Sequence, residues 1–217
     1  EYYRPRKKYR SFKKPKEAIK PREPAIAYLE SRGISEEIAK RYEITTLEGR
    51  KNVLVFPFYD SKGNLCFIKY RKTDFDKSKD RNKEWCEKDC RPILFGMKQC
   101  NDKYDRLVLT EGQIDSLSVA TAGIENAVSV PTGAKGFTWI PYCYDFVSKF
   151  QEIVVFGDCE KEHITLLDEV AKRFPCKIKH VRTEDYKGCK DANEILQKYG
   201  VEAIKNAIDK SIYVPVN

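Results

Sequence analysis

The sequence contains few of the residues and patterns that would place it among membrane or secreted proteins. Its 217 residues include a single Met and two His. No stretch reaches the roughly 18 consecutive apolar residues that a membrane-spanning helix requires, and no signal-peptide pattern is visible. With 41% hydrophobic residues, the composition is that of a globular chain with one substantial core or two smaller ones. Because the only Met is Met97, we expect the chain to be part of a longer protein.

Paired CxxC motifs are also absent, although the chain has eight cysteines. The spacing that comes nearest to a zinc site is Cys86-x3-Cys90, with Cys100 and Cys66 as further ligands, and no His lies near them in the sequence. Without a secretory signal, we predict a reducing compartment, free thiols and no zinc at these four residues. The other cysteines are scattered: Cys143, Cys159, Cys176 and Cys189.

The positive charge is concentrated at the N-terminus. The formal net charge is +8, and residues 1–24 hold ten Lys or Arg against three Glu. Prolines and aromatic residues alternate with these cations, a composition that does not favour a packed core. Two interpretations stay open for residues 1–24: a solvated Pro-rich linker, or a tail that holds phosphates and stacks on bases of a nucleic acid.

Residues 24–44 have the pattern of a helical hairpin. Gly33 ends the first predicted helix, and Ser35 is a suitable N-cap for the second. The second helix lacks the exposed base-reading side chains of a DNA-binding helix-turn-helix, so we interpret the pair as two packing helices.

Two β-rich runs follow, residues 53–58 and 65–71, joined by a turn at residues 60–64. Lys69 and Arg71 share one face of the second strand, and Lys72 follows them. Such cations can hold a triphosphate or a template backbone, or they can simply mark a solvated sheet face. Residues 74–89 are highly charged without periodicity and are predicted to be a loop.

Three apolar runs in the second half end in acidic residues. Residues 107–109 lead to Glu111, residues 153–156 lead to Asp158 and Glu160, and the run at 178–182 precedes Asp191. Strand, helix and strand alternate here, which predicts a parallel α/β sheet. Ligands bind at the carboxyl ends of such strands, and clustered carboxylates are tolerated chiefly where a divalent metal neutralises them. We therefore predict a metal site at this edge.

The intervening segments complete the α/β pattern. Helical spacing is found after Glu111, across residues 164–174 and at 201–208, and residues 211–217 read as a further linker. The strand at 127–130 ends in a Gly-rich loop that contains Lys135. This loop can cradle phosphate, although it lacks the full GxxxxGK[ST] pattern.

The motifs Thr110-Glu111-Gly112-Gln113-Ile114-Asp115, Gly157-Asp158-Cys159-Glu160 and Lys190-Asp191-Ala192-Asn193-Glu194 occur in this order after their strands. Together they resemble the TOPRIM domain of phage primase-helicases and mitochondrial Twinkle-like proteins. Upstream, LESRGISEEIAKRYEI (29–44), FPFYDSKGNLCFIKYR (56–71) and ILFG (93–96) resemble the N-terminal subdomain of the same polymerase region. The resemblance covers about residues 25–200.

The resemblance implies a TOPRIM-type parallel sheet flanked by helices and preceded by a smaller α+β subdomain. The expected division is a tail or linker at 1–24, an α+β primase subdomain at 25–103, and a TOPRIM domain with a C-terminal helix at 104–217. The implied activity is that of a DNA primase, which makes short RNA primers on single-stranded DNA by nucleotidyl transfer with Mg²⁺ or Mn²⁺. The expected partners are single-stranded DNA, ribonucleoside triphosphates, an upstream zinc-binding domain and a downstream helicase, with no membrane.

The site residues implied by the motifs fall into groups by role. The catalytic acids are Glu111, Asp158 and Glu160; these three and Asp191 are the metal ligands; Asp115 is a secondary acid; and Lys69, Arg71, Lys72 and Lys135 bind phosphate or template. The expected compartment is the cytoplasm of a bacterial or phage-infected cell, with the mitochondrion as the alternative.

The second motif departs from the family pattern. Asp-x-Asp is usual there, whereas this chain has Asp158-Cys159-Glu160. The longer Glu side chain shifts the carboxylate by about a bond length, and Mg²⁺ tolerates little error in its octahedral coordination. One alternative to the primase interpretation is therefore a non-catalytic DNA-binding remnant of a replicative helicase. The other is a metal-dependent TOPRIM nuclease, because the same acids could activate water against a phosphodiester.

Overall fold

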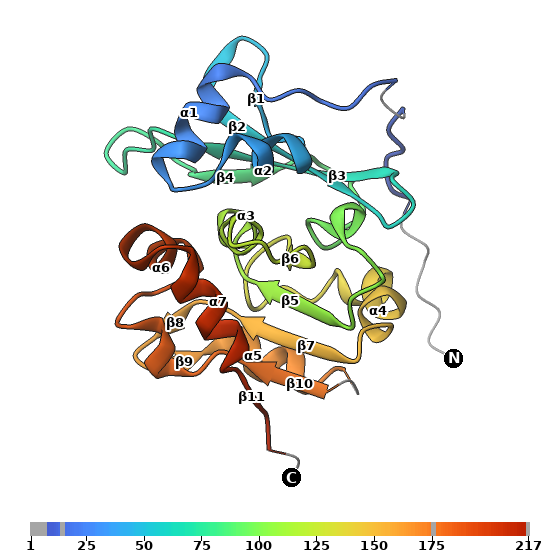
Figure 1. Ribbon diagram of the computed structural model, residues 1–217. Helices are drawn as coiled ribbons and strands as arrows, with labels where there is room; N and C mark the ends of the chain where they lie inside the picture. The colour runs from blue at the N-terminus through green and yellow to red at the C-terminus, as the bar shows by residue number, and fades with distance from the viewer. Residues whose placement is uncertain (1–7, 14–15, 175–176, 216–217) are drawn as a thin grey trace.

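A computed structural model describes residues 8–13, 16–174 and 177–215. It contains two main sheets, each with its own helices, stacked one above the other (Figure 1). Four cations of the predicted tail and one cysteine lie outside the described residues: Arg4, Arg6, Lys7, Lys14 and Cys176.

The N-terminal half is built on an antiparallel sheet of order β1-β2-β3-β4. The predicted hairpin is present, and its turn is closed by hydrogen bonds to Asp60 from the backbone N–H groups of Lys62 and Asn64. Residues 74–89 are not entirely a loop as predicted, because β4 pairs with β3 there and Trp85 stacks on Tyr70 with ring centroids 5.5 Å apart. The elements are α1 (Glu23–Ser31), α2 (Glu36–Arg41), β1 (Thr45–Leu47), β2 (Arg50–Tyr59), β3 (Leu65–Lys72) and β4 (Glu84–Cys86).

The C-terminal half is built on a sheet of order β11-β10-β7-β5-β6, in which all neighbours are parallel except β10 and β11. This confirms the predicted TOPRIM-type α/β fold. The predicted linker at 211–217 is wrong for residues 212 and 213, which form β11 because they pair with β10. The strands are β5 (Arg106–Thr110), β6 (Ala127–Ser129), β7 (Glu152–Phe156), β10 (Lys177–His180) and β11 (Ile212–Tyr213).

Helices cover both faces of the parallel sheet. Since the connections from β5 to β6 and from β7 to β10 run in opposite directions, right-handed crossovers place α3 on one face and α5 on the other. A short hairpin of β8 and β9 separates β7 from α5. The remaining elements are η1 (Met97–Gln99), α3 (Gln113–Thr121), α4 (Ile140–Ser148), β8 (Cys159–Glu160), β9 (His163–Ile164), α5 (Thr165–Ala171), η2 (Thr183–Tyr186), α6 (Ala192–Tyr199) and α7 (Val201–Asp209).

The two halves share one continuous apolar core. Phe95 exchanges two backbone hydrogen bonds with Ser129 at the end of β6, and the hydroxyl of Tyr42 donates to the backbone O of Ala127 at 3.0 Å. Phe95 also contacts the rings of Phe56 and Tyr42. The predicted domain boundary between residues 103 and 104 stays a prediction, because buried side chains from both sides belong to this core.

The described part of the basic tail contacts both halves of the molecule. Tyr9 accepts a hydrogen bond from the hydroxyl of Tyr142 on α4 at 2.7 Å, whereas Arg10 and Ile19 contact the N-terminal half. The backbone N–H of Arg10 donates to Asp89 O at 2.7 Å, and its guanidinium pairs with Glu87 at 2.8 Å. Further along, the backbone N–H of Ile19 donates to the buried carboxylate of Glu43 at 2.9 Å. Tyr9, Arg10 and Ile19 therefore have defined contacts, and the linker role of residues 1–24 stays a prediction.

Within the part of the chain that the structure describes, every helix is too short or too polar to cross a lipid bilayer.

Substitution of Gly96 tests the junction between the halves. Gly96 has φ +97°, and a Cβ there would lie 2.7 Å from the backbone O of Ala127. We expect Gly96→Ala to lower the free energy of unfolding by about 3 kcal/mol, because the left-handed backbone and the steric clash both oppose it. Gly123 has φ +89° but open space around its Cβ position, so Gly123→Ala should cost only about 1 kcal/mol. Urea denaturation measures both, and equal losses would contradict the proposed close approach.

Candidate active site

The acidic residues of the first two motifs lie at the switch point of the parallel sheet. β5 and β7 are adjacent, with Thr110 opposite Phe156, and the chain leaves them in opposite directions. Ligand sites in open α/β sheets lie where the strand order reverses in this way. The register therefore brings Glu111, which follows β5, and Asp158, which follows β7, to one edge.

Three carboxylates converge beside this edge. Asp115, Asp158 and Asp191 each offer an oxygen, and these oxygens lie within 4.8 Å of one another. Asp115 is on the first turn of α3 and accepts a hydrogen bond from the backbone N–H of Asn193 at 3.0 Å. Asp191 is the N-cap of α6 and accepts from the backbone N–H of Glu194 at 2.9 Å. Two helix starts and one strand end thus fix the triad.

Burial and mutual repulsion oppose ionisation of these acids. Burial, reinforced by the charges of Glu111 and Asp191, raises the pKa of Asp158 to about 7. The pKa of Asp115 is raised well above its usual value by burial and by the neighbouring Asp191 and Asp158. Burial also raises the pKa of Glu111, although hydrogen bonds donated by Asp158 and the charge of Lys190 act against this. The cluster therefore has too little neighbouring positive charge to balance its carboxylates.

A hard divalent cation fits this donor set. Mg²⁺ and Mn²⁺ prefer carboxylate oxygens, and the three aspartates offer them at close range from two helix starts and a strand end. Glu111 lies beside them and lines the same cavity as all three. Glu160, by contrast, is outside the triad: its side chain is 72% exposed, and it pairs with Lys190 at 3.3 Å. The converging triad thus includes Asp115, predicted as a secondary acid, and the predicted metal-ligand role of Glu160 stays a prediction.

Cations from both halves face the acids across a cavity of about 270 Å³, here called the cation cavity. The Lys69 ammonium is nearly buried, and it donates to Pro131 O at 3.0 Å and pairs with Glu84 at 3.3 Å. Arg71 also pairs with Glu84 at 3.3 Å, while its buried Nε has no hydrogen-bond partner among the described residues. The cations that line the cavity are Arg32, Lys69, Arg71, Lys83 and Lys190.

The cations of this cavity are crowded. The positive charge of Arg71, with burial as the second cause, lowers the pKa of Lys83, and Arg32 contributes in the same direction. A polyanion entering the cavity would relieve this repulsion. The two other predicted phosphate ligands lie elsewhere: Lys72 pairs with Asp80, and Lys135 is exposed on the Gly-rich loop beside a second cavity.

Asn193 connects the acids to the N-terminal half. Its side chain is buried and makes four hydrogen bonds: Nδ2 donates to Arg32 O at 2.8 Å and to Ser118 Oγ at 2.9 Å. Its Oδ1 accepts from Arg32 Nε at 3.0 Å and from Gln197 Nε2 at 2.7 Å. The same residue's backbone N–H binds Asp115. Asn193 thus fixes the position of Arg32 in the cation cavity relative to Asp115 in the triad.

Sequence reasoning did not single out Arg32, Lys83, Lys190 or the linking role of Asn193. Lys190 and Asn193 belong to the third motif, so their position beside Asp191 was a usable signal. Arg32 follows the last residue of α1, the first predicted helix, and the pattern of that helix indicates packing but no ligand contact. Lys83 lies in a charged segment without periodicity, where nothing in the sequence separates a functional cation from a solvated one.

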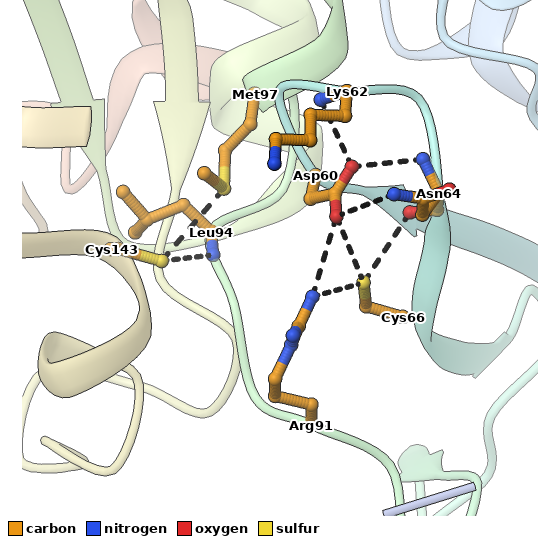
Figure 2. Close-up of polar contacts among 8 residues, drawn as sticks. All are labelled: Asp60, Lys62, Asn64, Cys66, Arg91, Leu94, Met97 and Cys143. Atoms are coloured by element: carbon orange, nitrogen blue, oxygen red, sulfur yellow. Dashed lines mark hydrogen bonds and ion pairs between the residues drawn. The ribbon is translucent and has the colours of Figure 1, made fainter. Parts of the chain in front are cut away.

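The cysteines of the suggested zinc set have separate surroundings. Cys66 lies beside Asp60 and accepts from the Arg91 guanidinium at 2.9 Å (Figure 2), whereas the thiols of Cys90 and Cys100 donate to the backbone O atoms of Lys88 and Gly96. Cys143, which is outside the suggested set, contacts Leu94 and Met97 in another part of the core (Figure 2). Burial raises the pKa of each described thiol, Cys100 and Cys143 to about 12. In the described part of the chain the acidic triad is the one group of three or more potential ligands that converges. The absence of zinc stays a prediction.

Two curated proteins of Arabidopsis thaliana are similar to this sequence, although no protein-family model matches it. One is the chloroplastic/mitochondrial Twinkle homolog, which is 27% identical over 205 residues that cover 83% of this chain and 27% of that protein. The other is a primase homolog, 26% identical over 200 residues that cover 83% of this chain and 57% of that protein. The chain thus spans about a quarter of one relative and a little over half of the other.

Several solved structures of primases have a similar fold. The Aquifex aeolicus primase, solved with its zinc-binding and RNA polymerase domains, has a TM-score of 0.72 at 18% identity, covering 89% of this chain and 57% of that one. The primase fragment of the bacteriophage T7 primase-helicase has a TM-score of 0.67 at 26% identity, covering 82% and 72%. A DnaG catalytic domain bound to single-stranded DNA has a TM-score of 0.66 at 18% identity, covering 88% and 72%.

The chain therefore has the fold of a primase catalytic core. More particularly, it is similar in sequence and fold to the TOPRIM primase domains of phage primase-helicases and Twinkle-like proteins, as the three motifs predicted.

The raised pKa of Asp158 predicts a pH-dependent stability. Without metal, the folded carboxyl keeps its proton up to about pH 7, whereas the usual pKa is 3.8. The folded state then binds more protons than the unfolded state, so the free energy of unfolding falls as the pH rises through this window. We expect a fall on the order of 2 kcal/mol that is smaller in Asp158→Asn. Urea denaturation in EDTA measures it, and identical pH slopes for the two proteins would contradict the assignment.

Gly112 tests the position of Asp115. Its backbone is extended, but a Cβ there would lie 2.8 Å from Asp115 Oδ2. We expect Gly112→Ala to weaken Mn²⁺ binding about ten-fold with little loss of stability, because the added methyl displaces a carboxylate. A double-mutant cycle with Asp115→Ala provides the control: in that background Gly112→Ala should have almost no further effect. Additive losses of Mn²⁺ affinity, measured by calorimetry, would show that the methyl acts elsewhere.

Proposed function

We propose that this chain is the catalytic domain of a DNA primase, which makes short RNA primers on single-stranded DNA by metal-dependent nucleotidyl transfer. The observation that carries this proposal is a single cavity, at the switch point of a primase-core fold, where an acid triad faces five cations. A polyphosphate with a bound divalent metal has the charge distribution that matches both sides of this cavity.

The cations hold the triphosphate of the incoming nucleotide. Lys69 is held by Pro131 O, so its ammonium needs little reorganisation to bind a phosphate oxygen. Arg71 offers a buried N–H that lacks a partner among the described residues. Glu84 bridges Lys69 and Arg71 without ligand, and a phosphate would take over these contacts.

The acids would hold Mg²⁺ or Mn²⁺, with Asp115, Asp158 and Asp191 as the ligands and Glu111 beside them. When bound, the metal supplies charge neutralisation of the reacting phosphate and of the pyrophosphate that leaves. Lys190 pairs with Glu160 and lies 3.9 Å from Asp158, and these charges raise the pKa of its ammonium. Lys190 thereby keeps part of the acidic edge neutral.

The reaction joins two ribonucleotides. The 3′-hydroxyl oxygen of one attacks the α-phosphorus of the other, the bond from that phosphorus to the β-phosphate oxygen breaks, pyrophosphate leaves, and the hydroxyl proton passes to water. This chain's residues orient both reactants and stabilise the developing negative charge; they form no covalent bond to the substrate.

The wider context is also proposed from the relatives. The T7 protein is a primase-helicase and the Aquifex structure includes a zinc-binding domain, so we propose a zinc-binding domain and a helicase as neighbours of this domain in the full-length protein. Single-stranded DNA is the proposed template, and the cations of residues 1–24 are proposed to contribute salt-dependent affinity for it. The proposed compartment is one in which DNA replicates: the bacterial or phage-infected cytoplasm, or the mitochondrion.

Substitution of the acids tests the proposed function. We expect Glu111→Gln and Asp158→Asn each to lower primer synthesis by roughly 100-fold or more while DNA binding is kept, because each removes a charge from the metal edge. Glu160→Gln should lower it only a few-fold, since this exposed side chain lies outside the triad. Glu162→Gln, on the same hairpin, is the matched control. The assay follows labelled ribonucleotides on single-stranded DNA with Mg²⁺ or Mn²⁺.

The same assay separates the alternatives. DNA cleavage that depends on Glu111, with no oligoribonucleotide on any template, would favour a nuclease. DNA binding without synthesis, cleavage or metal affinity would favour a non-catalytic remnant. A loss with Glu160→Gln as large as that with Asp158→Asn would place Glu160 on the metal in the active state.

A further inference from the structure

A second cavity lies on the other side of Glu111 and Asp158. It has a volume of about 580 Å³, and we call it the hairpin cavity because the β8–β9 hairpin forms one wall. The Gly-rich loop at residues 132–135 forms the opposite wall. Glu111, Gly133 and Asp158 line both cavities, so the acidic edge separates them. A volume of this size is within the range of roughly 300–1,000 Å³ that is usual for small-molecule sites.

The two cavities differ in charge. The cation cavity has five Lys or Arg, of which Lys69 and Arg71 are largely buried. The hairpin cavity has only two Lys, Lys135 and Lys161, which are both exposed, and Glu160 lines it in addition to the shared Glu111 and Asp158. Its His163 is paired with Asp168 at 2.9 Å. A triphosphate therefore binds better in the cation cavity, and the hairpin cavity suits a reactant with fewer phosphates.

The hairpin cavity also offers neutral hydrogen-bonding groups. Thr132 and Thr165 line it, and a hydroxyl can both donate to and accept from a ribose hydroxyl. Thr165 is the first residue of α5 and is half-buried, so its position is set by the helix. The hairpin turn itself is fixed by Lys161 and Glu162, which have left-handed backbones with φ of 50° and 61°.

Phosphoryl transfer requires the attacking and leaving oxygens to lie roughly in line on opposite sides of the phosphorus. With the pyrophosphate in the cation cavity and the reacting phosphorus at Glu111 and Asp158, the attacking hydroxyl must approach from the opposite side. We propose that the hairpin cavity binds the 3′-terminal ribonucleotide of the growing primer, with Thr165 and Lys135 as its specificity-determining residues. This inference rests on the proposed primase function and assigns its second reactant to a site.

Kinetics with a supplied dinucleotide test the assignment. The reaction extends a dinucleotide, paired to the template, by one ribonucleoside triphosphate, so a KM is obtained for each reactant. Thr165→Val and Lys135→Gln should each raise the KM for the dinucleotide about five-fold, with the KM for the triphosphate nearly unchanged. Lys83→Gln, in the cation cavity, should show the opposite pattern. Lys205→Gln, which lies on α7 outside both cavities, should change neither value.

A binding measurement separates this inference from the proposed function. A dinucleotide with a photoreactive 4-thiouridine at its 3′ end is crosslinked to the full chain, and the modified peptides are identified by mass spectrometry. Crosslinks at residues 131–136 or 159–165, reduced in Thr165→Val, support the hairpin cavity even if no primer is ever made. Crosslinks at Arg32 or Lys83, or no specific crosslink at all, overturn it, as does a Thr165→Val variant that raises only the KM for the triphosphate.

Discussion

The burial of several carboxylates close to one another is the constraint on which the rest of this structure depends. Burial and the neighbouring like charges both oppose ionisation, and together they raise the pKa of Asp158 to about 7. Such a cluster keeps its place only because the surrounding structure holds it. The register of β5 and β7 fixes the strand ends, the start of α6 fixes Asp191, and the backbone of Asn193 fixes Asp115. The stability of the fold and the affinity for a cation are therefore linked in this part of the molecule.

The cations that complement these acids come mostly from the other half of the chain. Lys69 and Arg71 lie on one face of β3, and Arg32 follows α1, whereas the acids belong to the parallel sheet and its helices. Neither half contains a complete site. This explains why the halves share a core and why Phe95 continues the edge of the parallel sheet beyond β6. The junction at Phe95 and Tyr42 serves the site by setting the distance between the cations and the acids.

Much of this arrangement could be predicted from the sequence. Apolar runs that end in acidic residues located the strands, and the rule that parallel strands present their carboxyl ends at one edge brought Glu111, Asp158 and Asp191 together. Alternation placed Lys69 and Arg71 on one face. Distances between elements were not predictable, because periodicity describes one element at a time. For this reason the sequence alone does not indicate that Asp115 joins the triad or that Arg32 lines the cation cavity. The β8–β9 hairpin turns Glu160 outward, and its turn depends on left-handed backbones at Lys161 and Glu162. Lys and Glu are not residue types that indicate a turn in a sequence.

The four hydrogen bonds of the Asn193 side chain also limit the motions available to this protein. They join the end of α1 to α3 and α6, and the two bonds to Arg32 connect the halves, so separation of the two sheets at this point would break both of these bonds. The two halves are therefore expected to move as one rigid body during a catalytic cycle. Under the proposed primase function, movement along a template would be accommodated by smaller elements at the rim, such as the exposed loop that carries Lys135 and the β8–β9 hairpin, and not by opening of the core.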